Sequence, residues 1–156
     1  MLVHLLLAFF LIGASVIIHG FGTLELQAWL ANSLQRNQDR RGRIHSGLLT
    51  IRMVSSLLVL HLLEASSWAV LNWLAQALPD GETAFYFSLT SYTTVGYGDV
   101  VLPPDWRLLG PLEAATGILM FGWSTGIMVA AITRIYGDQF RRVADTQEPG
   151  LDKQGK

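Results

Sequence analysis

Apolar residues fall into three long runs along the chain, separated by shorter polar stretches. The first run, Leu2 to Gly22, contains no charged residue. At about 1.5 Å per helical residue it is long enough to cross a hydrocarbon core of about 30 Å. The second run extends from Gly47 to Leu78 and the third from Leu108 to Tyr136. This pattern predicts an all-α membrane protein with three transmembrane helices.

Apolar and polar positions alternate with a helical period just after the first run. Four apolar positions recur at this spacing between residues 24 and 34, namely Leu26, Trp29, Leu30 and Leu34. We expect residues 1–34 to form an N-terminal transmembrane helix with an amphipathic extension near a membrane surface, anchored by Trp29. The run has no basic region before it and no small-residue cleavage site, which favours a retained helix over a secretory signal. We interpret His4 and His19 as interfacial or packing residues, because no second ligand lies at metal-binding spacing.

A short, aromatic-rich segment precedes the third apolar run. Pro79, Asp80 and Gly81 predict a turn, and residues 82–93 follow it. This segment is too short to span a membrane, and an unpaired strand could not satisfy its backbone at membrane depth. We therefore predict a re-entrant helix, whose carboxyl end carries the partial negative charge that favours a cation.

Charge is distributed unevenly over the polar stretches, although the formal net charge is only −1. Residues 35–46 carry four Arg against one Asp, whereas residues 79–107 carry four acidic residues against Arg107 alone. Since basic loops stay on the cytoplasmic side, we expect 35–46 to be a cytoplasmic loop and 137–156 a flexible, polar cytoplasmic tail. The N-terminus and an acidic vestibule that concentrates cations would then face outwards. The basic loop is short and has no interleaved aromatic residue, so nucleic acid is not an expected partner.

Composition supports a bilayer protein and gives no sign of an enzyme. Hydrophobic residues make up 51% and charged ones 15% of the 156 residues, and the mean hydropathy is +0.36. There is no cysteine, which excludes disulfides and thiolate metal sites. The four histidines are scattered, and no pair of a nucleophile and a base can be argued. We expect a multi-pass protein of the cell membrane, the inner one in a double-membrane bacterium, in contact with lipid and without an organic cofactor.

The stretch from Thr93 to Asp99 reads TTVGYGD. Its two glycines, Gly96 and Gly98, permit backbone conformations with positive φ, so that carbonyl oxygens can all turn to one side. Here the chain resembles the pore domain of tetrameric potassium channels, of the two-helix type but with an extra N-terminal transmembrane helix. The resemblance covers residues 47–136.

The resemblance implies an arrangement and a set of functional residues. It implies an outer helix at 47–78, a pore helix at 82–93, a filter at 94–98 and an inner helix at 108–136, in a homotetramer with fourfold symmetry. The implied K⁺ filter residues are Thr94, Val95, Gly96, Tyr97 and Gly98. The implied supporting residues are Thr93, Asp99, Tyr86 and Phe87. Gly117 falls near the hinge of the family's inner helix, although close helix packing would explain this glycine equally well. Gly122 and Gly126 form a GxxxG pair that lets helices approach closely.

Two carboxylates lie in the apolar runs and need an explanation. A charge at the bilayer centre costs about 2.5–3.5 kcal/mol, so Glu64 should be protonated, paired or turned towards protein. His61 precedes it by three residues on the same helical face, and the two could be a packing pair or a pH-sensing pair. Some relatives have a pore-helix carboxylate where this chain has Thr90. Glu64 or Glu113 could supply one from elsewhere.

The function predicted from the sequence is passive, selective K⁺ conduction through the TVGYG filter, with K⁺ as the permeating ligand. One alternative is a weakly selective cation channel, which Tyr97 disfavours because such channels usually depart from the motif there. Another is the pore subunit of a potassium uptake system, but known families carry four imperfect pore repeats in one chain and only one is present here. Sensing of voltage by a charged helix is not expected, since no segment has Arg at every third position.

Overall fold

The computed structural model describes residues 2–36 and 43–147. It contains four helices in these segments and no strand: α1 (Leu2–Arg36), α2 (Arg43–Leu74), α3 (Gly81–Tyr92) and α4 (Leu109–Gln147). Three of them, α1, α2 and α4, are long and apolar enough to cross a membrane. The predicted all-α membrane protein with three spanning helices and one short pore helix is therefore confirmed.

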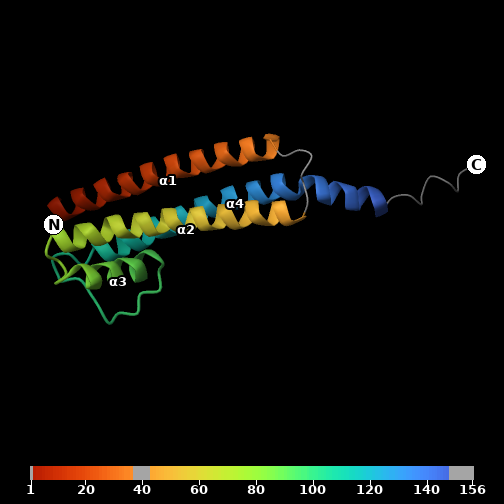
Figure 1. Ribbon diagram of the computed structural model, residues 1–156. Helices are drawn as coiled ribbons and strands as arrows, with labels where there is room; N and C mark the ends of the chain where they lie inside the picture. Colours follow the sequence, from red (N-terminus) through yellow and green to blue (C-terminus); the bar gives the residue numbers. More distant parts are fainter. Residues whose placement is uncertain (1, 37–42, 148–156) are drawn as a thin grey trace, which may run out of the picture.

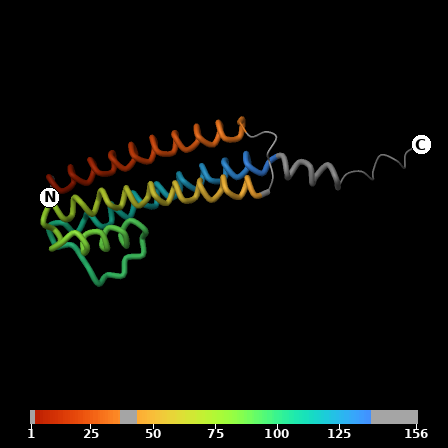
Figure 2. Tube along the Cα trace, viewed as in Figure 1, coloured from red at the N-terminus to blue at the C-terminus, as the bar shows by residue number. Residues whose placement is uncertain are grey.

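The three long helices run side by side, and α3 packs against one end of this bundle (Figure 1). Helix α3 contacts α2 and α4, while α1 contacts α2 and α4. The amino end of α1 lies at the same end of the bundle as the turn from α2 to α3 (Figures 1 and 2). The carboxyl end of α1 and the amino end of α2 lie at the other end. The chain therefore crosses the bundle three times, and the α3 region lies between the second and third crossings.

The outer helix ends at Leu74, four residues before the end predicted from the apolar run. Gln76 takes a left-handed conformation, with φ of 54°. The Gln76 N–H donates to the Trp73 carbonyl, and the Ala77 N–H donates to the Asn72 carbonyl. These two bonds form a Schellman cap, which closes the helix although the sequence stays apolar to Leu78.

Helix α3 begins where a side chain can cap it. Asp80 accepts hydrogen bonds from the Thr83 backbone N–H and the Thr83 hydroxyl, both at 2.8 Å. These donors hold the pKa of Asp80 below its usual value. The cap fixes the turn predicted at 79–81, and the pore helix matches its predicted bounds to within one residue.

The inner helix starts one residue later than predicted and continues past Tyr136 to Gln147. The polar tail expected from residue 137 is therefore helical in its first part, which corrects that prediction. Helix α2 begins at Arg43, four residues before the predicted start of the outer helix, so residues 35–36 and 43–46 of the expected basic loop are helical. Residues 37–42 of that loop and 148–156 of the expected tail lie outside the described residues.

Buried residues form two apolar clusters along the bundle. One surrounds Trp68 and Tyr92 near α3, and the other joins α1, α2 and α4 at the opposite end. The second cluster contains Leu26 and Leu30 of the predicted amphipathic extension. These side chains pack against α2 and α4, because α1 continues as one unbroken helix to Arg36. Trp29 likewise faces α2, where the Arg52 guanidinium lies 4.1 Å from its ring centre.

Candidate functional site

The loop after α3 has positive φ at every second residue of the TVGYG run. The φ values are 62° at Thr94, 52° at Gly96 and 77° at Gly98. A recurring left-handed residue is what a row of carbonyl groups turned to one side requires. Glycine adopts this conformation at no steric cost, but a β-branched residue such as Thr94 is strained there by about 1–3 kcal/mol.

Hydrogen bonds to carbonyl groups of α3 hold this strained backbone in place. The Thr94 N–H donates to the Ser91 carbonyl at 2.9 Å, and the Gly96 N–H donates to the Thr90 carbonyl at 3.1 Å. The Thr93 hydroxyl, at the helix cap, donates to the Leu89 carbonyl at 2.7 Å. The carbonyl groups of the last turn of α3 therefore fix the backbone conformation at the start of the loop.

The far end of the loop is fixed to α3 by one side-chain contact. The Tyr86 hydroxyl donates to Asp99 Oδ2 at 2.8 Å, and this bond raises the pKa of Tyr86. Phe87 is buried in the apolar core and faces Gly110 of α4. Tyr86 and Asp99 are thus brought together, while Phe87 packs in the core and also lines the hollow beside the loop.

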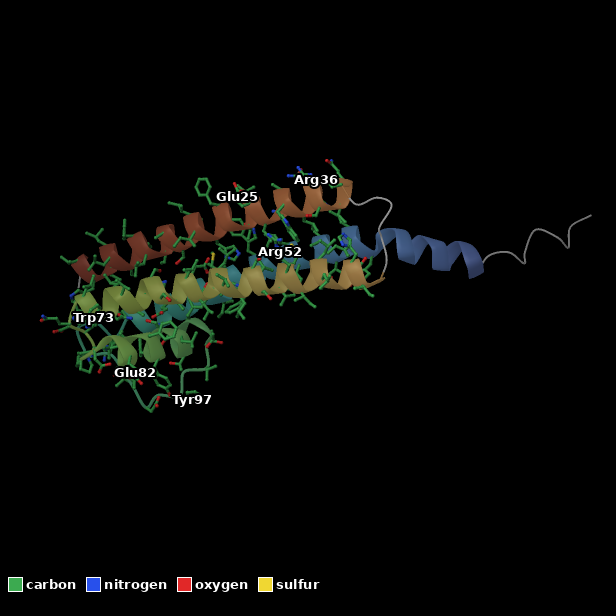
Figure 3. All side chains as sticks on the ribbon, in the orientation of Figure 1. Glu25, Arg36, Arg52, Trp73, Glu82 and Tyr97 are labelled. Carbon is green, nitrogen blue, oxygen red and sulfur yellow. The ribbon has the colours of Figure 1, made fainter. Side chains whose placement is uncertain are left out.

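Most of the loop surface is left uncovered by its own chain. The Tyr97 side chain is 73% exposed and points away from the bundle (Figure 3). Val95 is 52% and Val101 70% exposed. Among the described residues of a single chain, no ring contact braces Tyr97 against the α3 aromatics Tyr86 and Phe87. An open hollow of about 390 Å³ lies beside the loop, lined by Thr94 and Gly96 on one side and Pro111 on the other.

Gly117 lies against the end of α3. A Cβ placed on it would meet the Tyr92 carbonyl oxygen at 1.9 Å and the Tyr92 carbonyl carbon at 2.9 Å. Close packing of α4 on α3 thus accounts for this glycine without a hinge. At Gly122 and Gly126, by contrast, an added Cβ would meet no described atom within 4 Å, so the predicted GxxxG pair makes no close helix contact within the chain.

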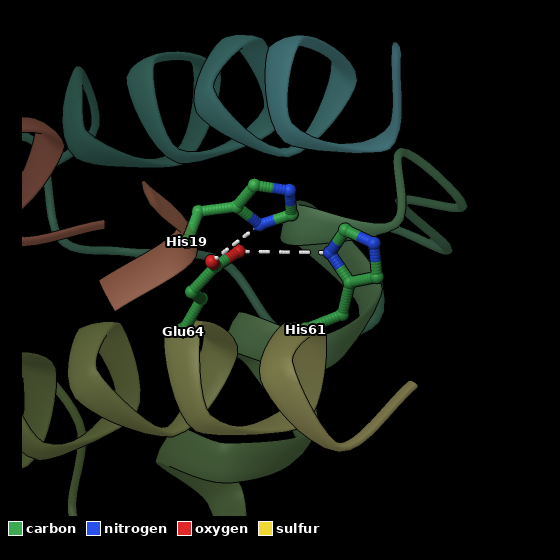
Figure 4. Close-up of side chains that lie close together, drawn as sticks. All are labelled: His19, His61 and Glu64. Atoms are coloured by element: carbon green, nitrogen blue, oxygen red, sulfur yellow. Dashed lines mark hydrogen bonds and ion pairs between the residues drawn. The ribbon is translucent and has the colours of Figure 1, made fainter. Parts of the chain in front are cut away.

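A second polar feature lies in the bundle behind the loop, which we call the polar cluster. It takes side chains from all four helices, namely His19, His61, Glu64, Tyr92 and Ser124. At the centre, His19 Nδ1 is 2.8 Å from Glu64 Oε1 and His61 Nδ1 is 3.5 Å from Glu64 Oε2 (Figure 4). The Tyr92 hydroxyl donates to Glu64 Oε2. Every member is less than 8% exposed.

His19 is the residue that the sequence interpretation missed. The sequence predicted only a packing role for it, but His19 is a direct hydrogen-bond partner of the buried Glu64, which lies 45 residues away in the chain. The pairing of His61 with Glu64 is confirmed. The side chains of His19, His61 and Glu64 bring three potential ligand atoms within 4.8 Å of one another. Each of the three already has a protein hydrogen-bond partner, so the described contacts account for them without a metal ion.

The two buried carboxylates have different surroundings. Glu64 reaches the hydroxyl of Tyr92, the last residue of α3, so it supplies from α2 a carboxylate at the end of the pore helix. Glu113 of α4 is fully buried beside Asn72 and Ser88, but neither of its oxygens is in hydrogen-bonding geometry with a partner. Its polar neighbours are therefore the side chains of Asn72 and Ser88, and a charge at this buried position would be costly.

Comparison with known proteins gives one family match. Residues 53–134, more than half of the chain, match the model of a family described as "Ion channel". This range runs from α2 through α3 and the TVGYG loop into α4, and it leaves α1 outside. No curated protein and no solved structure matches the chain.

Proposed function

Because this chain belongs to the ion channel family, we propose that it is a K⁺-selective channel of the membrane whose filter is the TVGYG loop at 94–98. The observation that carries the proposal is the backbone of this loop, with positive φ at Thr94, Gly96 and Gly98. Carbonyl oxygens turned to one side can replace the hydration shell of K⁺. The loop follows the carboxyl end of α3, whose dipole favours a cation.

The proposed channel is a homotetramer with fourfold symmetry. One chain leaves Tyr97 and Val101 at least 70% exposed and an open hollow beside the loop, so it cannot enclose a pore. Four copies around one axis would bring four loops together and cover these surfaces. In this assembly the brace of Tyr97 comes from a neighbouring copy, which explains why the single chain lacks it.

We place the N-terminus and the filter mouth outside and the C-terminus in the cytoplasm. The amino end of α1 and the turn before α3 lie at the same end of the bundle (Figure 1). That end carries Asp80 and Glu82, whereas the opposite end carries Arg36 at the last turn of α1. This charge difference matches the retention of basic segments in the cytoplasm.

The test is a reversal-potential measurement on purified protein in liposomes. A K⁺ gradient should set the reversal potential, and replacing K⁺ by Na⁺ on one side should shift it strongly. Tyr97→Asp should admit Na⁺ while current persists, because it removes the brace and adds a negative charge. Gly96→Ala should abolish K⁺ current, since a Cβ penalises the φ of 52°.

Gly13→Ala is the matched control for the glycine substitution, because this α1 glycine has open space around it. It should leave the current unchanged. Equal permeability to K⁺ and Na⁺ in the unmodified protein would replace the proposal with a weakly selective cation channel. Absence of any current would contradict the channel proposal itself.

A further inference from the structure

We propose that the polar cluster is a closed ring of hydrogen bonds that holds five protons and makes the filter respond to pH. This inference rests on the proposed channel function. It is carried by the contacts of His19, His61, Glu64, Tyr92 and Ser124, and His19 lies outside the residues that match the ion channel family. The ring therefore assigns a role to α1.

The contacts form an unbroken circuit. His19 Nδ1 lies 2.8 Å from Glu64 Oε1, and Glu64 Oε2 bonds the Tyr92 hydroxyl. That hydroxyl lies 3.2 Å from His61 Nδ1. The circuit closes through Ser124 Oγ, which lies 3.0 Å from His61 Nε2 and 3.2 Å from His19 Nε2. Both nitrogens of each imidazole and both oxygens of the carboxylate are used.

Five bonds in a closed circuit require five protons, one for each bond. With Glu64 as the neutral acid, every member donates once and accepts once in the same direction: Tyr92 to Glu64, Glu64 to His19, His19 to Ser124, Ser124 to His61 and His61 to Tyr92. Moving the Glu64 proton to a histidine gives a carboxylate and an imidazolium with the same total. Both forms have no net charge, which is the state least costly at membrane depth.

Loss of a proton breaks the circuit at Ser124. With Glu64 ionised and both histidines in the neutral Nδ1–H form, His19 and Tyr92 donate to the carboxylate and His61 donates to the Tyr92 oxygen. Both Nε2 atoms are then acceptors, but Ser124 has only one proton to donate. One bond between α4 and its neighbours is therefore lost. Tyr92 remains a phenol in every form.

Gain of a proton also disturbs the ring. Two imidazolium groups can both donate to the Ser124 oxygen, but its own hydroxyl proton then has no acceptor in the ring. The buried site also carries a net positive charge. The five-proton form is thus the one in which all bonds are made and no charge is left over.

The titratable groups that face the ring come from each helix packed around it. They are His19 on α1, His61 and Glu64 on α2, Tyr92 on α3, and Glu113 on α4, which lies near Tyr92. The recorded ion pairs of Glu64, among the described residues, are with His19 and His61. Phe121 of α4 stacks on His61, with 4.0 Å between the two ring centroids, and so places an apolar surface against the His61 imidazole.

Tyr92 connects the ring to the filter. It is the last residue of α3, its carbonyl lies against Gly117, and it precedes Thr94 by two residues. A complete ring holds this end of the pore helix between α2 and α4. A ring broken at Ser124 weakens the contact of α4 with the other helices, so the end of α3 and the strained Thr94 backbone that follows it are held less firmly and K⁺ conduction falls.

The test is the pH dependence of the stability of the assembled protein, measured by thermal unfolding. With ordinary pKa values of about 4.3 for Glu and 6.5 for His, the unfolded ring residues hold about six protons near pH 5.5 and about four near pH 8. A folded ring with five protons is therefore most favoured near pH 6.5. On either side the folding equilibrium constant should fall by up to about tenfold per pH unit.

Ser124→Ala removes the bridge without removing a titratable group. We expect it to flatten this pH dependence and to lower K⁺ flux in liposomes, and Ser124→Thr should restore both. Tyr92→Phe opens the circuit elsewhere and should flatten the profile in the same way. His4→Gln, which removes an α1 histidine that stacks on Trp106 outside the ring, should keep the original profile.

A Ser124→Ala profile parallel to that of the unmodified protein, only shifted to lower stability, would show a merely structural contact and overturn the ring. Stabilisation by Zn²⁺ that disappears in His19→Gln would overturn it in favour of a metal centre. Unmodified protein that conducts no K⁺ at any pH contradicts the proposed function instead. The stability profile is measured without conduction, so the two failures are distinguishable.

Discussion

Replacing Gly117 by Ala separates close packing from a flexible hinge. The substituted Cβ would lie 1.9 Å from the Tyr92 carbonyl oxygen, and ordinary contact begins at about 3.4 Å. Backbone atoms cannot rotate aside as a flexible side chain can, so α4 and the end of α3 must move apart. Overpacking of this kind costs about 1–3 kcal/mol.

An opposing effect must be subtracted from this cost. Ala is preferred over Gly in a helix interior by about 0.5–1 kcal/mol. A backbone contact as short as 1.9 Å puts the overpacking cost in the upper part of its range, about 2–3 kcal/mol, so the net expectation is a loss of roughly 1–2.5 kcal/mol in the free energy of unfolding. For a chain of this size, 1 kcal/mol shifts the Tm by about 2–4 °C, so the Tm should fall by roughly 2–10 °C.

The assay is thermal unfolding in detergent, followed by circular dichroism and paired with K⁺ flux in liposomes. Gly13→Ala is the matched control because it meets no atom within 4 Å; it should raise the Tm slightly through helix propensity alone. A Gly117→Ala protein as stable as the original would refute the packing argument. Higher stability with a lower open probability would establish the hinge.

Three further predictions address α1, the α3 cap and the orientation of the chain. Leu30→Ala should reduce the free energy of unfolding by about 2–5 kcal/mol, because this side chain is buried between α2 and α4. Leu24→Ala, at a position 63% exposed, should change it far less. Equal effects of the two substitutions in chemical denaturation would contradict the packing of the second half of α1 against α2 and α4. Asp80→Ala should lower the Tm by removing the α3 cap, and Asp80→Asn should retain most of it. Since the folded pKa of Asp80 is depressed, its contribution should be present at neutral pH and lost as the pH falls through that pKa; a cap effect that persists in strong acid would argue against this account. Reporters fused to the two termini should be accessible from opposite sides of the membrane, the N-terminal one from outside, and labelling from the same side would rule out the three-span topology.

Hydropathy and length predicted the spans and the short pore helix of this chain. A long apolar run in a bilayer can satisfy all its backbone hydrogen bonds within one segment only as a helix. The turn at Pro79, Asp80 and Gly81 was also predictable, because the cap acts over only three residues. The glycines at 96 and 98 permit positive φ, and the structure has positive φ at both positions.

Helix ends were predicted less well where local chemistry competes with hydropathy. The outer helix stops at Leu74 because a left-handed Gln76 closes a Schellman cap inside an apolar run. The inner helix continues past Tyr136 although its residues become polar. Hydropathy indicates which residues can lie in lipid. The end of a helix depends instead on local backbone conformation, such as a left-handed residue, so the two need not coincide.

The sequence by itself determined the number of spans, the pore helix and the TVGYG loop, because each depends on residues close together in the chain. Tertiary structure alone decided that Gly117 lies on the Tyr92 carbonyl and that His19 meets Glu64 and Ser124, at separations of 45 and 105 residues. Such contacts depend on the rotation and axial offset of one helix against another. A hydrophobic pattern leaves both undefined when lipid and protein interiors are equally apolar.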